Sequence, residues 1–186
     1  MAVRLDRIVT RAGDGGETSL GDGRRVRKDD PRIEVLGALD EANCAVGLAR
    51  LHTHDDAAAD QMLARIQNDL FDLGADMSVP PQPDSARSRL RIADSQVVRL
   101  EAEIAAMNAS LPPLKSFVLP GGTPAAAHLH LARALVRRAE RRMAALPEGV
   151  GAAALRFANR LSDHLFVLAR RLNAGADPLW QPGENR

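Results

Sequence analysis

Aromatic residues are scarce in this chain, and this and other scarcities exclude several classes of protein. Only 3% of the 186 residues are aromatic and none is Tyr. That composition disfavours β-sandwiches and barrels, and also the stacking platforms that bind single-stranded nucleic acid. The single cysteine, Cys44, excludes an internal disulfide and a multi-cysteine zinc cluster. A formal net charge of +1 argues against a general nucleic-acid coat.

Long hydrophobic runs are also missing. No apolar stretch approaches the roughly 18–20 residues that a membrane-spanning helix needs, and the first residues lack the apolar core of a signal peptide. The sequence therefore predicts a cytoplasmic protein that does not engage a membrane. With 45% hydrophobic and 26% charged residues, the composition is that of a globular chain. Its length predicts a single domain over residues 1–186.

Ala, Leu and Arg, which are strong helix formers, dominate the composition. Five segments repeat apolar residues at the three- and four-residue steps of helices that pack in a bundle. We expect helices over residues 31 to about 52, 57–77, 94 to about 111, 124–146 and 150–174, with Asp94 and Thr123 as caps. The prediction is an all-α five-helix bundle over residues 32–175. A glycine-rich arm (residues 1–31) precedes it, a loose tail (176–186) follows it, and residues 79–91 form a mobile loop.

The arm departs from a plain bundle. Gly13, Gly15 and Gly16 are interleaved with threonine and serine, and successive N–H groups of such a loop can point at one anion. Lys28 and neighbouring arginines add positive charge. The sequence contains neither a P-loop nor a dinucleotide-binding glycine motif. From composition alone, a structureless, flexible leader is an equally good interpretation.

The expected fourth helix carries five arginines and one glutamate within ten residues. At about 100° per residue, Arg133, Arg137 and Glu140 fall within an arc of roughly 60° beside the apolar seam. Like charges in that place repel one another unless an anion or facing carboxylates compensate them. The pattern favours an anion site, and the alternative is an exposed basic face with Glu140 as an internal partner.

Two other helices carry polar groups that could complement these arginines. Asp40, Glu41 and Asn43 lie within one turn of the first helix and could meet the arginines of the fourth. On the fifth helix, Asn159 shares a face with Asp163, which could pair with the nearby Arg160. For the fifth helix, a structural hydrogen-bond network is the alternative to a binding role.

The remaining reactive side chains do not indicate a catalytic group. His128 and His130 are two positions apart and would project in nearly opposite directions from a helix. His52 and His54 fit a helix end, and Cys44 fits a small core residue. Since no Ser–His–Asp or Cys–His arrangement is readable, the sequence predicts neither a side-chain nucleophile nor a metal site built from protein ligands.

Six runs of sequence together carry a family resemblance. They are TRAGDGGET (10–18), GRR (23–25) with Lys28, GALDE (37–41), FVLPGG (117–122), RRAER (137–141) and NRLSD (159–163). In this order, and over nearly the whole chain, they resemble the propanediol-utilisation type of ATP:cob(I)alamin adenosyltransferase. No single run is specific, but the set is.

The resemblance implies a homotrimer with active sites at subunit interfaces. It also implies transfer of the 5′-deoxyadenosyl group of ATP to the cobalt of cob(I)alamin, which forms adenosylcobalamin and releases triphosphate. Carried over by position, the ATP site comprises Thr10, Arg11, Ala12, Gly13, Thr18, Lys28, Arg137, Arg138, Ala139, Glu140, Arg141 and Asn159. The catalytic set comprises Arg133, Phe117 beneath the corrin, and Asp40 with Arg137 as an intersubunit salt bridge. Ala12 stands where the family commonly has threonine, so we expect weaker ATP binding at most.

Such a reaction needs no nucleophile from the protein, because cob(I)alamin is itself one. We expect Mg²⁺ to bridge the phosphates, and Phe117 to exclude the lower axial ligand of cobalt, although a plain core role for Phe117 is the alternative. A corrinoid reductase and a B12-dependent acceptor enzyme are expected as transient partners. Two rival functions are a non-catalytic corrinoid or nucleotide carrier, and a helical module whose arginines bind an acidic partner.

Overall fold

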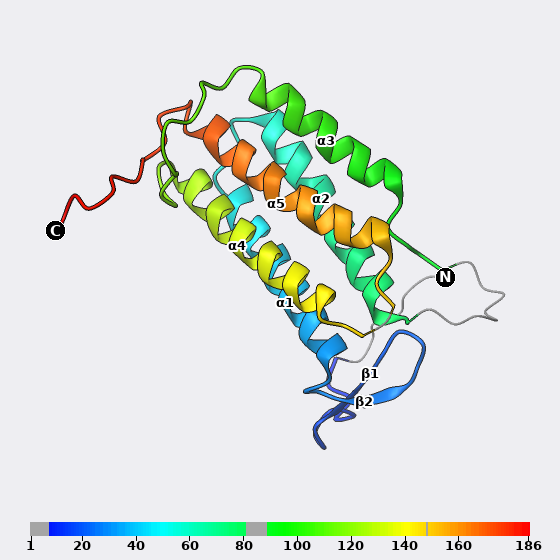
Figure 1. Ribbon diagram of the computed structural model, residues 1–186. Coiled ribbons are helices and arrows are strands. Elements are labelled where there is room, and N and C mark those ends of the chain that lie inside the picture. The colour runs from blue at the N-terminus through cyan, green and yellow to red at the C-terminus, as the bar shows by residue number, and fades with distance from the viewer. Residues whose placement is uncertain (1–7, 81–88, 148) are drawn as a thin grey trace.

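The computed structural model describes residues 8–80, 89–147 and 149–186, and in them it shows five long helices with a small β-hairpin at one end (Figure 1). The helices are α1 Pro31–Arg50, α2 Ala57–Ser78, α3 Asp94–Asn108, α4 Pro124–Ala144 and α5 Ala152–Leu172. The hairpin pairs β1 Glu17–Ser19 with β2 Arg25–Arg27 in antiparallel register. The predicted all-α class and five-helix bundle are confirmed. The division into arm, bundle and tail as one domain stays a prediction.

The core lies between helices that pack through their apolar seams. α4 packs against α1 and α5, while α2 packs against α1, and α3 against α5. The predicted seam of α4 is buried in these contacts: Leu129, Ala132, Val136, Ala139 and Met143. Burying a side chain such as Leu or Met contributes about 1.5–3 kcal/mol, so this seam fixes which side of α4 faces outward.

From residue 8 on, the arm is not structureless, which was one of the two interpretations that its composition allowed. Its two strands pair Glu17 with Arg27, and Leu20 in the connecting turn is only 6% exposed. The Gly21 amide donates to the Ser78 carbonyl at 3.0 Å, and a β-carbon on Gly21 would lie 2.5 Å from Ser78 Oγ. Only glycine fits so close an approach. The hairpin is therefore held at the C-terminal end of α2.

Helix ends follow the predicted signals only in part. Thr123 caps α4 as expected, since its Oγ1 accepts from the Ala126 amide at 3.2 Å. The prediction that Asp94 caps the third helix is wrong. Ala93 occupies the cap position of α3, and its amide donates to Gln96 Oε1 at 2.9 Å. α3 also ends at Asn108 rather than near residue 111, one turn earlier than expected.

Two further expectations are wrong. Cys44 is exposed rather than part of the core, because it lies on α1 between two buried positions but outside the packed stripe. The tail is not loose at its start: the Leu119 amide donates to the Pro178 carbonyl, and the Trp180 amide to the Phe117 carbonyl, each at 2.8 Å. The loop expected over residues 79–91 falls mostly on residues 81–88, which lie outside the described chain. Within the described chain, no helix is long and apolar enough to cross a membrane.

The cap of α2 gives a stability prediction. The Asp56 carboxylate accepts from the Ala59 amide at 3.0 Å and pairs with Arg171 of α5 at 2.7 Å. These hydrogen bonds, the backbone one first, lower the pKa of Asp56 below its ordinary value. We expect Asp56→Ala to reduce the free energy of unfolding by about 1–2 kcal/mol at neutral pH.

This contribution is present above the ordinary pKa of an aspartate and is lost as the pH falls through the lowered pKa of the folded state. Urea unfolding at neutral and at acidic pH should therefore show the difference between parent and Asp56→Ala shrinking in acid. Asp55→Ala, which removes an exposed neighbouring carboxylate, is the control and should change little. Equal losses in the two variants would contradict the role of Asp56.

Candidate functional site

One face of α4 presents three arginines in successive turns: Arg133, Arg137 and Arg141. Arg137 and Arg141 are exposed, while Arg133 is partly buried, and its Nε has no hydrogen-bond partner in the described chain. Burial first, and the charge of Arg137 second, lower the pKa of Arg133. This surface, called the α4 basic face below, is a cationic surface without a carboxylate partner in the described residues. That arrangement favours binding of an anion.

Next to this face, the fifth helix supplies one of the predicted site residues. Asn159 Nδ2 of α5 donates to Glu140 Oε1 of α4 at 2.9 Å. The structure thus brings together two residues that the sequence places 19 positions apart. Ala139, which lies between Arg138 and Glu140 in the sequence, is fully buried. Its side chain packs in the core and cannot itself contact a ligand in this conformation.

The predicted meeting of carboxylates on α1 with arginines on α4 is confirmed for Glu41, which forms an ion pair with Arg138. Arg142 also lies 3.9 Å from Glu34. Asn43 instead faces α2, where its Nδ2 donates to the Gln67 carbonyl at 3.2 Å. Arg138 is therefore already paired within the chain, unlike the residues of the α4 basic face.

Lys28 closes over the first turn of the arm. Its Nζ would lie 3.1 Å from a β-carbon added to Gly13, so the ammonium group packs closely over the glycine backbone there. Arg25 Nη2 donates to the Ala12 carbonyl at 2.7 Å, and Arg11 has a left-handed φ of 61°. A non-glycine residue in that region is uncommon and points to a constrained loop. The predicted residues Thr10 to Gly13 and Lys28 thus form one cluster, called the arm cluster below; Thr18 sits on β1 behind it.

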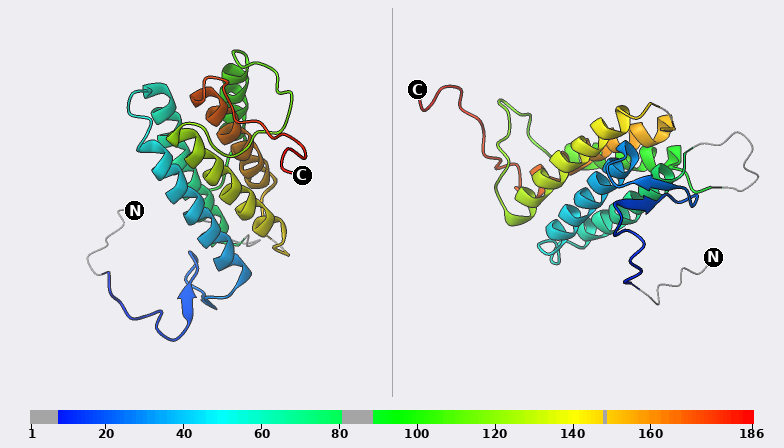
Figure 2. Two further views of the ribbon diagram at one scale, coloured as in Figure 1. Left: turned by 90° about the vertical axis from the view of Figure 1, so that its left-hand side faces the viewer. Right: turned by 90° about the horizontal axis from the view of Figure 1, so that it is seen from below.

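The arm cluster and the α4 basic face are not joined within one chain. Among the described residues, no hydrogen bond or ion pair joins residues 10–30 to α4. The arm is instead hydrogen-bonded to itself, to α1 and to Ser78 of α2. Figure 2 shows the hairpin beyond the start of α1, at the end of the bundle opposite the C-terminal tail. Each chain therefore carries two separate halves of the predicted site.

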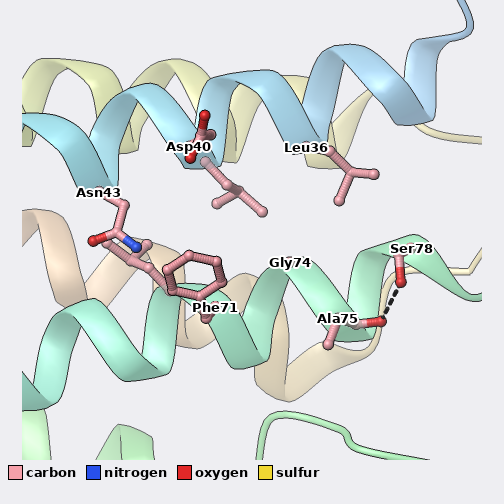
Figure 3. Close-up of a pocket in the computed structure, with 9 residues that line it drawn as sticks. Leu36, Asp40, Asn43, Phe71, Gly74, Ala75 and Ser78 are labelled. Atoms are coloured by element: carbon pink, nitrogen blue, oxygen red, sulfur yellow. Dashed lines mark hydrogen bonds between the residues drawn. The ribbon is translucent and has the colours of Figure 1, made fainter. Parts of the chain in front are cut away.

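Asp40 does not lie on the side of α1 that packs against α4, the helix that carries the α4 basic face. It lies at the α1 edge of a mainly apolar groove of about 290 Å³, which Leu36 and Asn43 of α1 and Phe71 and Gly74 of α2 also line (Figure 3). Phe71 is 72% exposed, and the Asn43 Oδ1 is buried without a partner in the described chain. Phe71 was not among the predicted site residues, although an apolar residue off the seam of the second helix was a readable signal.

Phe117 is not a core residue, because 76% of its side chain is exposed. It lies in the segment before α4, and its ring contacts that of Trp180 at a centroid distance of 5.8 Å. No partner for either ring could be predicted from the sequence, since 63 positions separate them. His130 is buried while His128 stacks on His52, so these two histidines project in different directions, as their spacing predicts. Within the described chain, no cluster of three or more His, Cys, Asp or Glu could hold a metal.

Comparison with known proteins decides the family. A family profile described as "Cobalamin adenosyltransferase" matches residues 8–172. The chain belongs to the cobalamin adenosyltransferase family. Among curated members of this family, a corrinoid adenosyltransferase of Mycobacterium tuberculosis (strain H37Rv) is 50% identical over 190 residues, which cover 100% of this chain and 98% of the relative. A cobalamin adenosyltransferase of Cupriavidus metallidurans is 45% identical over 97% of each chain.

Solved structures of the family have the same fold. A variant of a PduO-type ATP:corrinoid adenosyltransferase from Lactobacillus reuteri, complexed with cobalamin and ATP, matches this structure with a TM-score of 0.87 and 35% identity. The match covers 95% of this chain and 97% of that chain. The resemblance noted in the sequence is thereby confirmed at the level of family and fold.

Proposed function

We propose that this member of the cobalamin adenosyltransferase family transfers the 5′-deoxyadenosyl group of ATP to the cobalt of cob(I)alamin, in sites that form between copies of the chain. The observation that carries the proposal is the separation of the arm cluster from the α4 basic face within one chain. The arm cluster and the α4 basic face each present cationic side chains to a polyphosphate, but neither of them alone surrounds one. A cytoplasmic location, a corrinoid reductase and a B12-dependent acceptor enzyme stay predictions.

A ring of three chains would join the halves. In a closed cyclic assembly, one surface of each copy meets a different surface of the next. The groove that holds Asp40 and the exposed Phe71 is an apolar surface with one carboxylate, and the α4 basic face has unpaired guanidinium groups. Opposite charges and an exposed aromatic anchor are what a specific interface uses. We therefore assign Asp40 of one copy to Arg137 of its neighbour.

The chemical step needs only positioning and charge from the protein. The cobalt of cob(I)alamin supplies the electron pair that forms the Co–C bond, the bond between C5′ and the bridging oxygen breaks, and triphosphate leaves with that bond's electrons. Lys28, Arg137 and Arg141 would stabilise the charge on the leaving group. Asn159, held by Glu140, would orient the nucleotide, and correct orientation can be worth about 7–11 kcal/mol.

Mg²⁺ would accompany the nucleotide rather than occupy a site built only from protein ligands. Among the described residues, no group of three or more His, Cys, Asp or Glu side chains could hold a metal ion. This fits Mg²⁺, which is commonly held by substrate phosphates, waters and one or two carboxylates. When bound, it would offset negative charge on the phosphates.

Phe117 would act on the corrin side of the site. Its exposed ring gives an apolar surface at the N-terminal end of α4, where a water or a nucleotide base could not easily coordinate cobalt from below. Without a lower axial ligand, Co(II) is more easily reduced to Co(I) by an external one-electron donor. We assign that role to Phe117.

Anaerobic mixing of the protein with ATP, Mg²⁺ and chemically reduced cobalamin tests the function. We expect the corrin absorption to change from that of cob(I)alamin to that of adenosylcobalamin over many turnovers, with one triphosphate released per turnover. A carrier would give at most one change per site. A structural module would give none, and either result would refute the proposal.

Lys28→Met tests the arm cluster. Because a hydrogen bond to a charged group is worth about 1.5–3 kcal/mol, we expect the concentration of ATP for half-maximal rate to rise about tenfold or more. Arg27→Met is the matched control, since the Arg27 guanidinium is paired with Asp29 at 2.8 Å. If the ATP concentration for half-maximal rate rose similarly in both variants, the cause would be a general loss of positive charge rather than a specific contact of Lys28.

Charge exchange tests the proposed interface. Asp40→Arg and Arg137→Asp should each weaken self-association, measured by analytical ultracentrifugation, by about tenfold or more, because removing one partner of an interfacial charge pair costs about 2–5 kcal/mol. The double variant should recover assembly.

Asp40→Arg combined with Arg133→Asp is the comparison, because Arg133 lies one turn away on the same face. If self-association recovered only in that combination, the partner of Asp40 would be Arg133, and the assignment to Arg137 would be refuted. If none of the variants changed assembly, this groove would not be the interface.

A further inference from the structure

The start of the tail forms a built structure with the segment before α4. Val118 and Leu179 form an antiparallel β-bridge. Its flanking hydrogen bonds, from Leu119 to Pro178 and from Trp180 to Phe117, both measure 2.8 Å. Ser116 Oγ also donates to the Trp180 carbonyl at 2.6 Å. Two segments about 60 residues apart are thus fixed side by side.

A buried polar network anchors this pairing to the end of α5. Arg170 pairs with Asp177 at 3.0 Å, and their side chains are only 6% and 1% exposed. Arg170 also donates to the Pro112 carbonyl at 2.6 Å. Asn173 donates to the Gly121 carbonyl and to Asp177. Because buried polar groups are costly unless they are satisfied, this network holds both segments in one arrangement.

The rings of Phe117 and Trp180 both lie on the exposed side of this structure. Their centroids are 5.8 Å apart and their planes tilt by 52°, a favourable geometry for an aromatic pair. Phe117 is 76% exposed and Trp180 is 44% exposed. An exposed phenylalanine would otherwise sample several rotamers, so the indole limits where the Phe117 ring can lie.

We propose that Trp180 is a positioning residue for Phe117: the tail holds the indole against the phenyl ring, so that the ring is already placed to keep a lower ligand away from cobalt. The inference rests on the role of Phe117 in the proposed function. Trp180 is the only tryptophan of the chain, and no other assigned role accounts for its position. A Phe117 ring that was not already held in place would occupy the required position for a smaller fraction of the time. It would therefore exclude the lower ligand of cobalt less effectively.

The consequence is specific to one oxidation state of the substrate. Cob(I)alamin carries no axial ligand that must be excluded, whereas cob(II)alamin does. Loss of the Trp180 ring should therefore reduce the fraction of bound cob(II)alamin that is four-coordinate. The rate from cob(II)alamin plus a chemical one-electron reductant should fall more than the rate from pre-reduced cob(I)alamin.

The experiment compares four variants of the full chain: Trp180→Ala, Trp180→Phe, Phe117→Ala and Leu179→Ala. Electron paramagnetic resonance of cob(II)alamin bound with ATP measures the four-coordinate fraction, and the two assays give the ratio of rates. For Trp180→Ala we expect both the fraction and the rate ratio to fall about threefold to tenfold, the worth of an aromatic pair. Trp180→Phe should retain most of both.

Leu179→Ala keeps the backbone bonds and removes a neighbouring apolar side chain, so it should match the parent. If Trp180→Ala matched the parent, or lowered both rates equally, the inference would be wrong. If Leu179→Ala reproduced the loss, general disturbance of the tail would explain it and the inference would also be wrong. Phe117→Ala tests the proposed role of Phe117 separately from the inference about Trp180. If Phe117→Ala left the four-coordinate signal intact, the proposed role of Phe117 would be wrong as well.

Discussion

The packing of α4 against α1 and α5 is the contact on which the rest of the site depends. Burying Val136, Ala139 and Met143 in the core fixes the rotation of the helix about its axis. The rotation also fixes the direction in which the neighbouring face of α4 points, because all side chains of a helix turn together. That face carries Arg133, Arg137 and Arg141. A rotation that hid these guanidinium groups would expose the seam and lose several kcal/mol of apolar burial.

The separation of the arm cluster from the α4 basic face follows from the same packing. The hairpin is held near Ser78 at the end of α2, and α1 lies between α2 and α4. A chain built this way leaves Asp40 and the α4 basic face on different sides of one helix. The ring of copies proposed above would bring these unlike surfaces together and would enclose a charged ligand between them. The low local dielectric of such an enclosed site strengthens every charged contact in it.

Much of the fold was predictable, because the helices depend on local spacing. Buried residues such as Leu63, Ile66 and Leu70 lie where the apolar repeat placed them. The contact of Glu140 with Asn159 was not predicted, since it depends on the rotation of two helices about their axes. The hairpin was missed because strands of three residues carry too little pattern to be read. The tail was misjudged because its hydrogen bonds go to residues about 60 positions away.

The sequence by itself determined which helices form, which of their faces are apolar, and which residues resemble those of the family, because spacing, caps and motifs are written along the chain. Only the tertiary structure decided that Glu41 rather than Asp40 pairs with α4 inside a chain, that Cys44 faces outward, and that Trp180 meets Phe117. Those outcomes depend on helix rotation and on contacts between distant segments, and the free energy of such contacts is a property of the packed bundle rather than of any short stretch of sequence.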